Sequence, residues 1–451
     1  MESGMGGDKF TDYGENQFVV ASEMPTSTFS VDTDGASYTI MRRYFNSGQK
    51  PPVASVRIEE YLNYFTFDYP EPGAGHNVSL QTEMASCPWT EGNYLLRIGL
   101  KGKNVPESQL PPTNYVFLID VSGSMDSSDK LGILKEGFKS LVDVLGEQDR
   151  IAIVTYAGSS RVVLESTSCD EKGKIKNAIE KLSAGGSTAG AQGILTAYEI
   201  AKKNFIPGGN NRIIIGSDGD FNVGPVSNEE LVELIEGQRD YGIYLTVLGV
   251  GSGNLNDSMM EQLANKGNGT YEYIDNLSQL QKVFVNERSK FHAVAKDCKI
   301  QVNFNPEAVE KYRLIGYENR VMNNEDFEDD KKDAGEIGVG QTVTAIYEIV
   351  PAETFSGKAA NIDIKYKMPS GEESVMTLSG TADAAATNIM SASDNMRFAA
   401  GVTAFGLQMK ESKFKGKANK AMVLELCTEA TGHDTFGYRE EFVRLVKKIS
   451  F

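Results

Sequence analysis

Oxygen-bearing side chains gather in one short stretch of the sequence, YVFLIDVSGSM at residues 115–125. Asp120 ends an apolar run typical of a buried strand, and Ser122 and Ser124 follow it two and four residues later. In an open α/β sheet, ligands bind beyond the carboxyl ends of the strands. Carboxylate and hydroxyl oxygens at that edge are suited to Mg²⁺ or a similar hard cation. The stretch therefore predicts a cation site at the end of a strand.

Two later segments are expected to reach the same edge of the sheet. Thr188 lies in GGSTAG, just before a stretch with helical periodicity, and Asp218 lies in GSDGDFNVG, directly after an apolar run. Taken alone, each segment is more often a turn or a helix cap, because Gly, Ser, Thr and Asp favour both. Together the three segments predict one metal site, formed by Asp120, Ser122, Ser124, Thr188 and Asp218.

Residues 114–288 carry the pattern of the elements that would position this site. Short apolar runs (YVFLID, RIAIVTY, RIIIGSD and YLTVLGV) alternate with amphipathic helical stretches. Such runs are typical of buried parallel strands whose connecting helices cover both faces of the sheet. We therefore expect an α/β, Rossmann-like fold with a mostly parallel sheet and helices on both faces.

The combination of Asp-x-Ser-x-Ser, a downstream Thr and a downstream Asp after a strand resembles the metal-ion-dependent adhesion site of von Willebrand factor type A (VWA) domains. The resemblance implies that Ser122, Ser124 and Thr188 bind the ion directly, whereas Asp120 and Asp218 act mainly through bound water. It implies Mg²⁺ as the cofactor, with Ca²⁺ or Mn²⁺ as alternatives. Because hydroxyl ligands leave the cation poorly neutralised, it can accept a carboxylate from a partner.

The wider chain resembles the bacterial YfbK-like subgroup of VWA proteins. The resemblance rests on TFSVDTDGASYTIMRR and RIEEYLNYF ahead of the α/β stretch and on SDGDFNVG within it. One departure is Ser217, where Thr is more often expected before the metal Asp, although a hydroxyl is kept. The subgroup implies an exported bacterial envelope protein, in the periplasm or at the cell surface, often held by a lipid anchor.

The pattern along the chain predicts several segments around the VWA domain. The Asn77–Ala85 and Tyr94–Leu100 strands are expected to pair with strands of the Cys298–Met368 region, which would make the α/β domain an insertion. The predicted segments are a disordered leader (1–22), an N-terminal segment of helices and strands (23–113), the VWA domain (114–288), a β-rich companion domain (289–385) and a C-terminal helical segment (386–451).

Charge and composition exclude several classes of partner. The 451 residues include 45 Lys and Arg against 62 Asp and Glu, so the formal net charge is −17. Such a charge opposes binding to nucleic acid or to an anionic bilayer, and membrane contact is expected only through a lipid anchor. The four cysteines lie far apart, with no pattern of a disulfide scaffold or a zinc site.

These observations predict a non-enzymatic, metal-dependent adhesion module that recognises an unknown protein through an exposed Asp or Glu of that partner. Two alternatives stay open. The first is a structural envelope protein in which the ion only holds the loops together and binds no partner. The second is a serine hydrolase, favoured only by the weak elbow-like GGSTA and by an S-x-x-K at Ser127 and Lys130 without its companion motifs.

Overall fold

The computed structural model describes residues 2–3, 7–186, 190–219, 228–369, 375–432 and 434–450. The chain forms two compact units. The first, here called the α/β unit, comprises Met1–Thr11 and Pro106–His292. The second, here called the β-rich unit, comprises Asp12–Val105 and Ala293–Phe451, so its two stretches of chain flank the longer part of the α/β unit.

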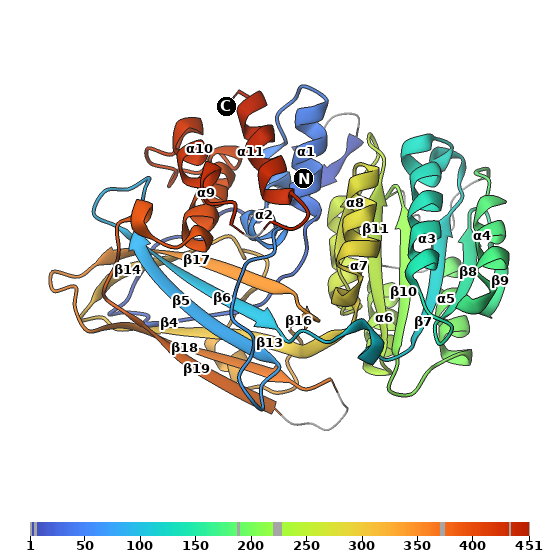
Figure 1. The fold of residues 1–451 in the computed structure, drawn as a ribbon, viewed down its shortest axis with the longest axis horizontal. Helices are drawn as coiled ribbons and strands as arrows, with labels where there is room; N and C mark the ends of the chain where they lie inside the picture. Colours follow the sequence, from blue (N-terminus) through green and yellow to red (C-terminus); the bar gives the residue numbers. More distant parts are fainter. Residues whose placement is uncertain are drawn as a thin grey trace. The chain divides into compact units, whose positions relative to one another are not determined.

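The α/β unit contains a sheet of six described strands in the order β12-β11-β10-β7-β8-β9 (Figure 1). Neighbouring strands are parallel except at β9, which is antiparallel to β8. The strands are β7 (Thr113–Asp120), β8 (Arg150–Tyr156), β9 (Ser160–Ser168), β10 (Asn210–Ser217), β11 (Ile243–Val250) and β12 (Tyr271–Ile274). The helices are α3 (Ile133–Val144), α4 (Lys172–Glu180), α5 (Gly190–Lys203), α6 (Asn228–Asp240), α7 (Asp257–Lys266) and α8 (Leu277–Gln281).

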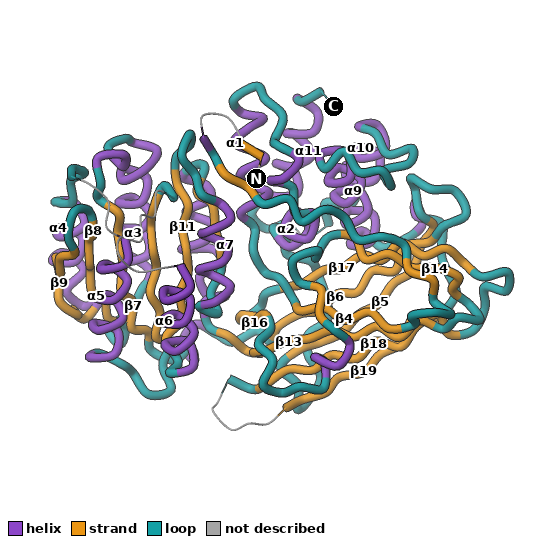
Figure 2. Tube along the Cα trace, turned by 180° about the vertical axis from the view of Figure 1, so that it is seen from behind, coloured by secondary structure: helices purple, strands orange, loops and turns teal. Residues whose placement is uncertain are grey.

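Burial on both faces explains the continuous apolar runs of these strands. Every residue of β7 and of β10 is buried, as expected for central parallel strands covered by helices on both sides. Phe117 of β7 stacks on Phe138 of α3 with ring centroids 4.2 Å apart, and α5 packs on the sheet as well. Figures 1 and 2 show helices on both faces. The predicted Rossmann-like α/β fold is confirmed.

The β-rich unit contains two antiparallel sheets and a group of helices (Figure 2). One sheet has the order β15-β4-β13-β18-β19, with β16 also paired to β13, and the other has the order β3-β14-β17-β6-β5. The strands are β3 (Val19–Val20), β4 (Thr26–Ser30), β5 (Val78–Ser86), β6 (Tyr94–Gly102), β13 (Ala293–Phe304), β14 (Val309–Ile315), β15 (Val321–Met322), β16 (Gly335–Gly338), β17 (Thr342–Pro351), β18 (Lys358–Lys367) and β19 (Val375–Asp383). The helices are α1 (Ala36–Asn46), α2 (Ile58–Asn63), α9 (Asp394–Met409), α10 (Lys420–Thr428) and α11 (Tyr438–Lys448).

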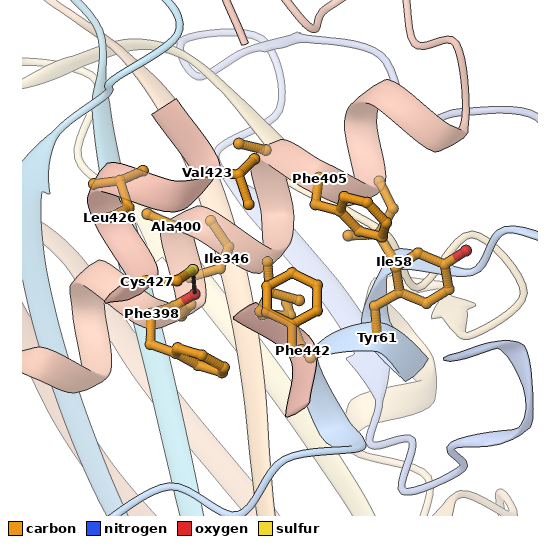
Figure 3. Packing of buried hydrophobic residues seen from close by; sticks show 14 of the residues in the cluster. Ile58, Tyr61, Ile346, Phe398, Ala400, Phe405, Val423, Leu426, Cys427 and Phe442 are labelled. Atoms are coloured by element: carbon orange, nitrogen blue, oxygen red, sulfur yellow. Dashed lines mark hydrogen bonds between the residues drawn. The ribbon is translucent and has the colours of Figure 1, made fainter. Parts of the chain in front are cut away.

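An aromatic-rich core joins these helices to the second sheet (Figure 3). Tyr61 of α2, Phe398 and Phe405 of α9 and Phe442 of α11 belong to one buried cluster, which also includes Ile346 of β17. Close ring pairs such as Phe405 and Phe442, with centroids 5.3 Å apart, add specific geometry to the burial of apolar area. The predicted extra β-rich region and terminal helices are thus present and packed together.

Strand pairing in the β-rich unit follows one of the sequence-based expectations. β6 pairs with β17 over Tyr94–Lys101, and β5 pairs with β6 along its length. The expected pairing with the Cys298–Met368 region is confirmed for the Tyr94–Leu100 strand, whereas the Asn77–Ala85 strand pairs with β6 at the edge of the sheet. The short strand β4 was not predicted, and it pairs with β13 and β15.

The disordered leader predicted for residues 1–22 is wrong where the structure describes it. Short strands β1 (Glu2–Ser3) and β2 (Lys9–Phe10) pair with each other, and Phe10 is fully buried. Further along, β3 pairs with β14. A polar segment without periodicity can still be ordered by bonds to distant parts of the chain and by a few buried side chains, and here Asp8 bonds to Gly253 and Leu255.

Candidate metal centre

Four of the five predicted metal residues, Asp120, Ser122, Ser124 and Asp218, lie where two neighbouring parallel strands end. Asp120 is the last residue of β7, and Asp218 follows Ser217, the last residue of β10. β7 and β10 are paired in the sheet, and the chain leaves β7 toward β8 on the opposite side. This is a topological switch point, the place where open α/β sheets bind ligands.

The Asp-x-Ser-x-Ser loop folds back on its own carboxylate. The backbone N–H of Ser122 donates to Oδ1 of Asp120 at 2.8 Å, and Oγ of Ser217 donates to Oδ2 at 3.0 Å. The hydroxyl oxygens of Ser122 and Ser124 lie 3.0 Å apart. Two neighbouring ligands of an octahedral Mg²⁺ at about 2.1 Å would be separated by about 3 Å. The loop geometry therefore fits two hydroxyl ligands on one ion.

Asp218 is fully buried and is held by a lysine from the loop after β7. Nζ of Lys130 donates to Oδ2 of Asp218 at 2.9 Å and to Oδ1 of Asn254 at 3.3 Å. Burial acts to raise the pKa of Asp218, but hydrogen bonds from Asn254, Lys130 and Ser124 outweigh it and lower the pKa. Asp218 is therefore an anion at neutral pH.

The negative charge of Asp218 also affects the pKa of Asp120. Burial raises the pKa of the Asp120 carboxyl, the hydrogen bonds from Ser122 oppose this effect, and the charge of Asp218 raises the pKa further. Two carboxylates that disfavour each other's ionisation in a buried place favour a cation between them. The donor set and its electrostatics thus fit a hard divalent ion.

The loop that carries Thr188 begins next to this centre. The N–H of Gly185 donates to the carbonyl of Val121 at 2.7 Å, and the N–H of Gly123 donates to the carbonyl of Gly186 at 3.1 Å. Gly186 has a φ of +94°, a conformation that favours glycine. Thr188 itself lies outside the described residues, and its role as a ligand stays a prediction.

Sequence reasoning missed Lys130 as a member of the site. From the sequence, it was considered only as part of an S-x-x-K pattern. In the structure, α3 begins at Ile133, and Lys130 lies in the π-helical turn over Ser128–Gly132 that precedes it. Such turns are frequent at functional sites. The position of Lys130 between the Asp-x-Ser-x-Ser motif and the next helix does not by itself specify a contact with Asp218, which lies 88 residues further along the chain.

Other potential sites gained no support. In the part of the chain that the structure describes, no group of three or more His, Cys, Asp or Glu side chains is arranged to hold an ion. The four cysteines are buried and free. No described helix has both the length and the apolar character needed to cross a membrane.

Family models match three parts of the chain. The model described as von Willebrand factor type A domain matches residues 114–286, and one described as von Willebrand factor matches residues 5–97. The model described as uncharacterized protein YfbK, C-terminal, matches residues 289–360 and 352–451.

Similar proteins include several without an assigned role. Uncharacterized protein YfbK of Escherichia coli K12 is 38% identical over 478 aligned residues, which cover 97% of this chain and 80% of that protein. Uncharacterized protein sll0103 of Synechocystis is 29% identical over 192 residues, or 42% of this chain and 44% of that protein. A solved von Willebrand factor type A structure from Catenulispora acidiphila has 16% identity and a TM-score of 0.49, covering 86% of this chain and 92% of its own.

Proposed function

This chain belongs to the YfbK family of proteins with a VWA domain, and on that premise we propose that its α/β unit binds a partner protein through a divalent cation. Ser122, Ser124 and Thr188 would hold the ion directly, and Asp120 and Asp218 would act through bound water. The ion would polarise and attract an anionic group of the partner. We propose Mg²⁺, with Ca²⁺ or Mn²⁺ as alternatives.

The observation that carries the proposal is the arrangement of oxygen atoms at the switch point. Two buried carboxylates lie at the ends of neighbouring strands, and two hydroxyl oxygens lie 3.0 Å apart beside them. Neutral hydroxyl ligands leave most of the ion's charge available. A carboxylate from an Asp or Glu of the partner would complete the coordination.

Binding agrees better than catalysis with the bonds that the carboxylates make. Asp120 accepts hydrogen bonds from Ser122 and Ser217, and Asp218 is paired with Lys130. Each carboxylate is therefore occupied in holding its own loop rather than placed to accept a proton from a substrate. We propose that the protein is not an enzyme.

The alternative hypothesis is an ion with a purely structural role, and the contacts between the loops disfavour it. The Gly185–Val121 and Gly123–Gly186 hydrogen bonds already join the two loops through their backbones. The two loops therefore do not need an ion to hold them together. We propose further that the protein acts in the bacterial cell envelope, attached through a lipid anchor, with a partner that is a protein rather than a nucleic acid.

Ion binding tests the proposal directly. In titration calorimetry with Mn²⁺, the full chain should bind one ion, and Ser124→Ala should weaken binding at least about tenfold by removing a direct ligand. Ser128→Ala is the matched control, because Ser128 is an exposed serine of the same loop. Equal affinities for all three proteins would place the ion elsewhere.

Partner capture tests the second half of the proposal. Immobilised full chain should retain an envelope protein in Mg²⁺ and release it in EDTA, and Thr188→Ala should retain less of it. Substitution of the acidic contact in the captured protein by its amide should abolish retention. A partner retained equally in Mg²⁺, in EDTA and by Thr188→Ala would refute metal-mediated recognition.

A further inference from the structure

Lys130 brings a fixed positive charge into the candidate metal centre. Its side chain is 13% exposed, and its ammonium group lies 2.9 Å from the fully buried carboxylate of Asp218. The amide oxygen of Asn254 accepts a second hydrogen bond from the same group at 3.3 Å. The lysine therefore takes up part of the coordinating capacity of Asp218.

The loop after β11 keeps the lysine in this position. Gly251 has a φ of +71°, and a Cβ atom there would collide with the stem of Lys130. The same loop is tied to the N-terminal segment, because Oδ1 of Asp8 accepts hydrogen bonds from the N–H groups of Gly253 at 2.8 Å and Leu255 at 3.1 Å. The position of the ammonium group is thus built into the fold rather than chosen from many rotamers.

Charge balance gives this lysine a consequence for the ion. Asp120 and Asp218 contribute two negative charges when ionised, and Lys130 contributes one positive charge. A divalent ion would bring the centre to neutrality without Lys130 and to a net charge of +1 with it. The ammonium group would also repel the ion, since both would share one carboxylate.

We propose that Lys130 is a built-in competitor of the divalent ion, which shares Asp218 with it and weakens ion binding. The inference rests on the proposed function, because it concerns the same centre. If the two cations lie about 6 Å apart, Coulomb's law with the dielectric constant of bulk water gives about a tenfold effect on affinity. Lower local polarity would enlarge the effect.

The test is the affinity of the full chain for Mn²⁺ alone, measured by titration calorimetry and by the electron paramagnetic resonance signal of free Mn²⁺. Lys130→Met keeps much of the apolar stem and removes the charge, and it should bind Mn²⁺ about tenfold more tightly than the wild type. Lys130→Arg keeps the charge and should stay within about threefold of the wild type. Lys139→Met is the matched control, since Lys139 lies further along α3 and pairs with Glu136 and Glu180.

The direction of the change separates competition from a structural role. A lysine that only supports the loops would, once removed, loosen the site and weaken Mn²⁺ binding. Equal or weaker binding by Lys130→Met, with the wild type still binding the ion, would overturn the inference and leave the proposed function intact. Failure of both the wild type and Lys130→Met to bind Mn²⁺ would overturn the proposed function, and the inference with it.

Discussion

Glu59 is a buried carboxyl group on α2 with an unusual proton affinity. The residue is 1% exposed, and burial together with the charges of Glu318 and Asp32 raises its pKa from 4.5 to about 8. Arg320 pairs with Asp32 at 2.9 Å, and the charge of Lys410 opposes the rise in the pKa of Glu318. These positive charges offset only part of the negative charge of the three carboxyl groups. Glu59 is therefore mostly protonated at neutral pH.

The raised pKa makes stability depend on pH. Because Glu59 holds its proton more tightly in the folded state, its contribution is fully present below pH 4.5 and is lost as the pH rises through about 8. Glu59→Gln, which mimics the protonated form, should remove this loss and make the protein more stable than the wild type at pH 9 by about 1–3 kcal/mol. Urea unfolding at pH 5.5, 7 and 9 measures the difference.

The exposed Glu23 provides the control for this measurement. Glu23→Gln should show the wild-type dependence of unfolding free energy on pH. A Glu59→Gln protein that keeps the wild-type pH dependence, or that is less stable than the wild type at pH 9, would show that folding does not raise the pKa of Glu59.

The candidate site was predictable to the extent that it depends on local spacing. Asp120, Ser122 and Ser124 lie within five residues, and Asp218 directly follows an apolar strand, so the sheet rule alone brings them to one edge. The contact between Lys130 and Asp218 joins residues 88 positions apart. No local pattern specifies which lysine reaches that carboxylate, because the choice depends on how α3 and the loop after β11 pack.

At the scale of elements, helices with strong local signals were predicted well. Helix α9 lies in the predicted C-terminal helical segment (386–451), and Ser393 caps it by accepting a hydrogen bond from the N–H of Met396 at 3.1 Å. The N-terminal segment was mispredicted because its order depends on distant residues rather than on local signals. Its bonds join Asp8 to a loop about 245 residues away, and short polar sequences give no sign of such partners.

The N-terminal segment should stabilise the loop after β11. Asp8→Ala would leave the N–H groups of Gly253 and Leu255 without their carboxylate acceptor, at a cost of about 1–3 kcal/mol for an unsatisfied buried donor. Hydrogen exchange at these two amides should then become faster by about one to two orders of magnitude.

Asp12→Ala is the control for this experiment. Asp12 accepts a hydrogen bond from the N–H of Gly14 at an exposed position, and its loss should change stability by less than about 0.5 kcal/mol. Unchanged protection of Gly253 and Leu255 in Asp8→Ala would mean that the loop holds its shape without the N-terminal segment.

At the scale of the whole molecule, the two units differ in whether the strands of each sheet come from one stretch of the sequence or from two. All six described strands of the mostly parallel sheet, from β7 to β12, lie within Pro106–His292. The antiparallel sheets instead combine strands from both flanking stretches, since β4 pairs with β13 and β6 pairs with β17. The α/β unit carries its core in one stretch, whereas the β-rich unit needs both of its stretches.

This difference predicts how fragments behave. Residues 106–292 expressed alone should fold and melt cooperatively, with some loss of stability because the buried Phe10 and Asp8 are missing. Residues 293–451 alone should not fold, because β13 and β17 would each lose a neighbour and expose unpaired backbone groups along central strands. Co-expression of residues 12–105 with residues 293–451 should restore a soluble complex. Circular dichroism melting of each fragment is the measurement, and a cooperative transition for residues 293–451 alone would show that the later stretch folds without β4 and β6.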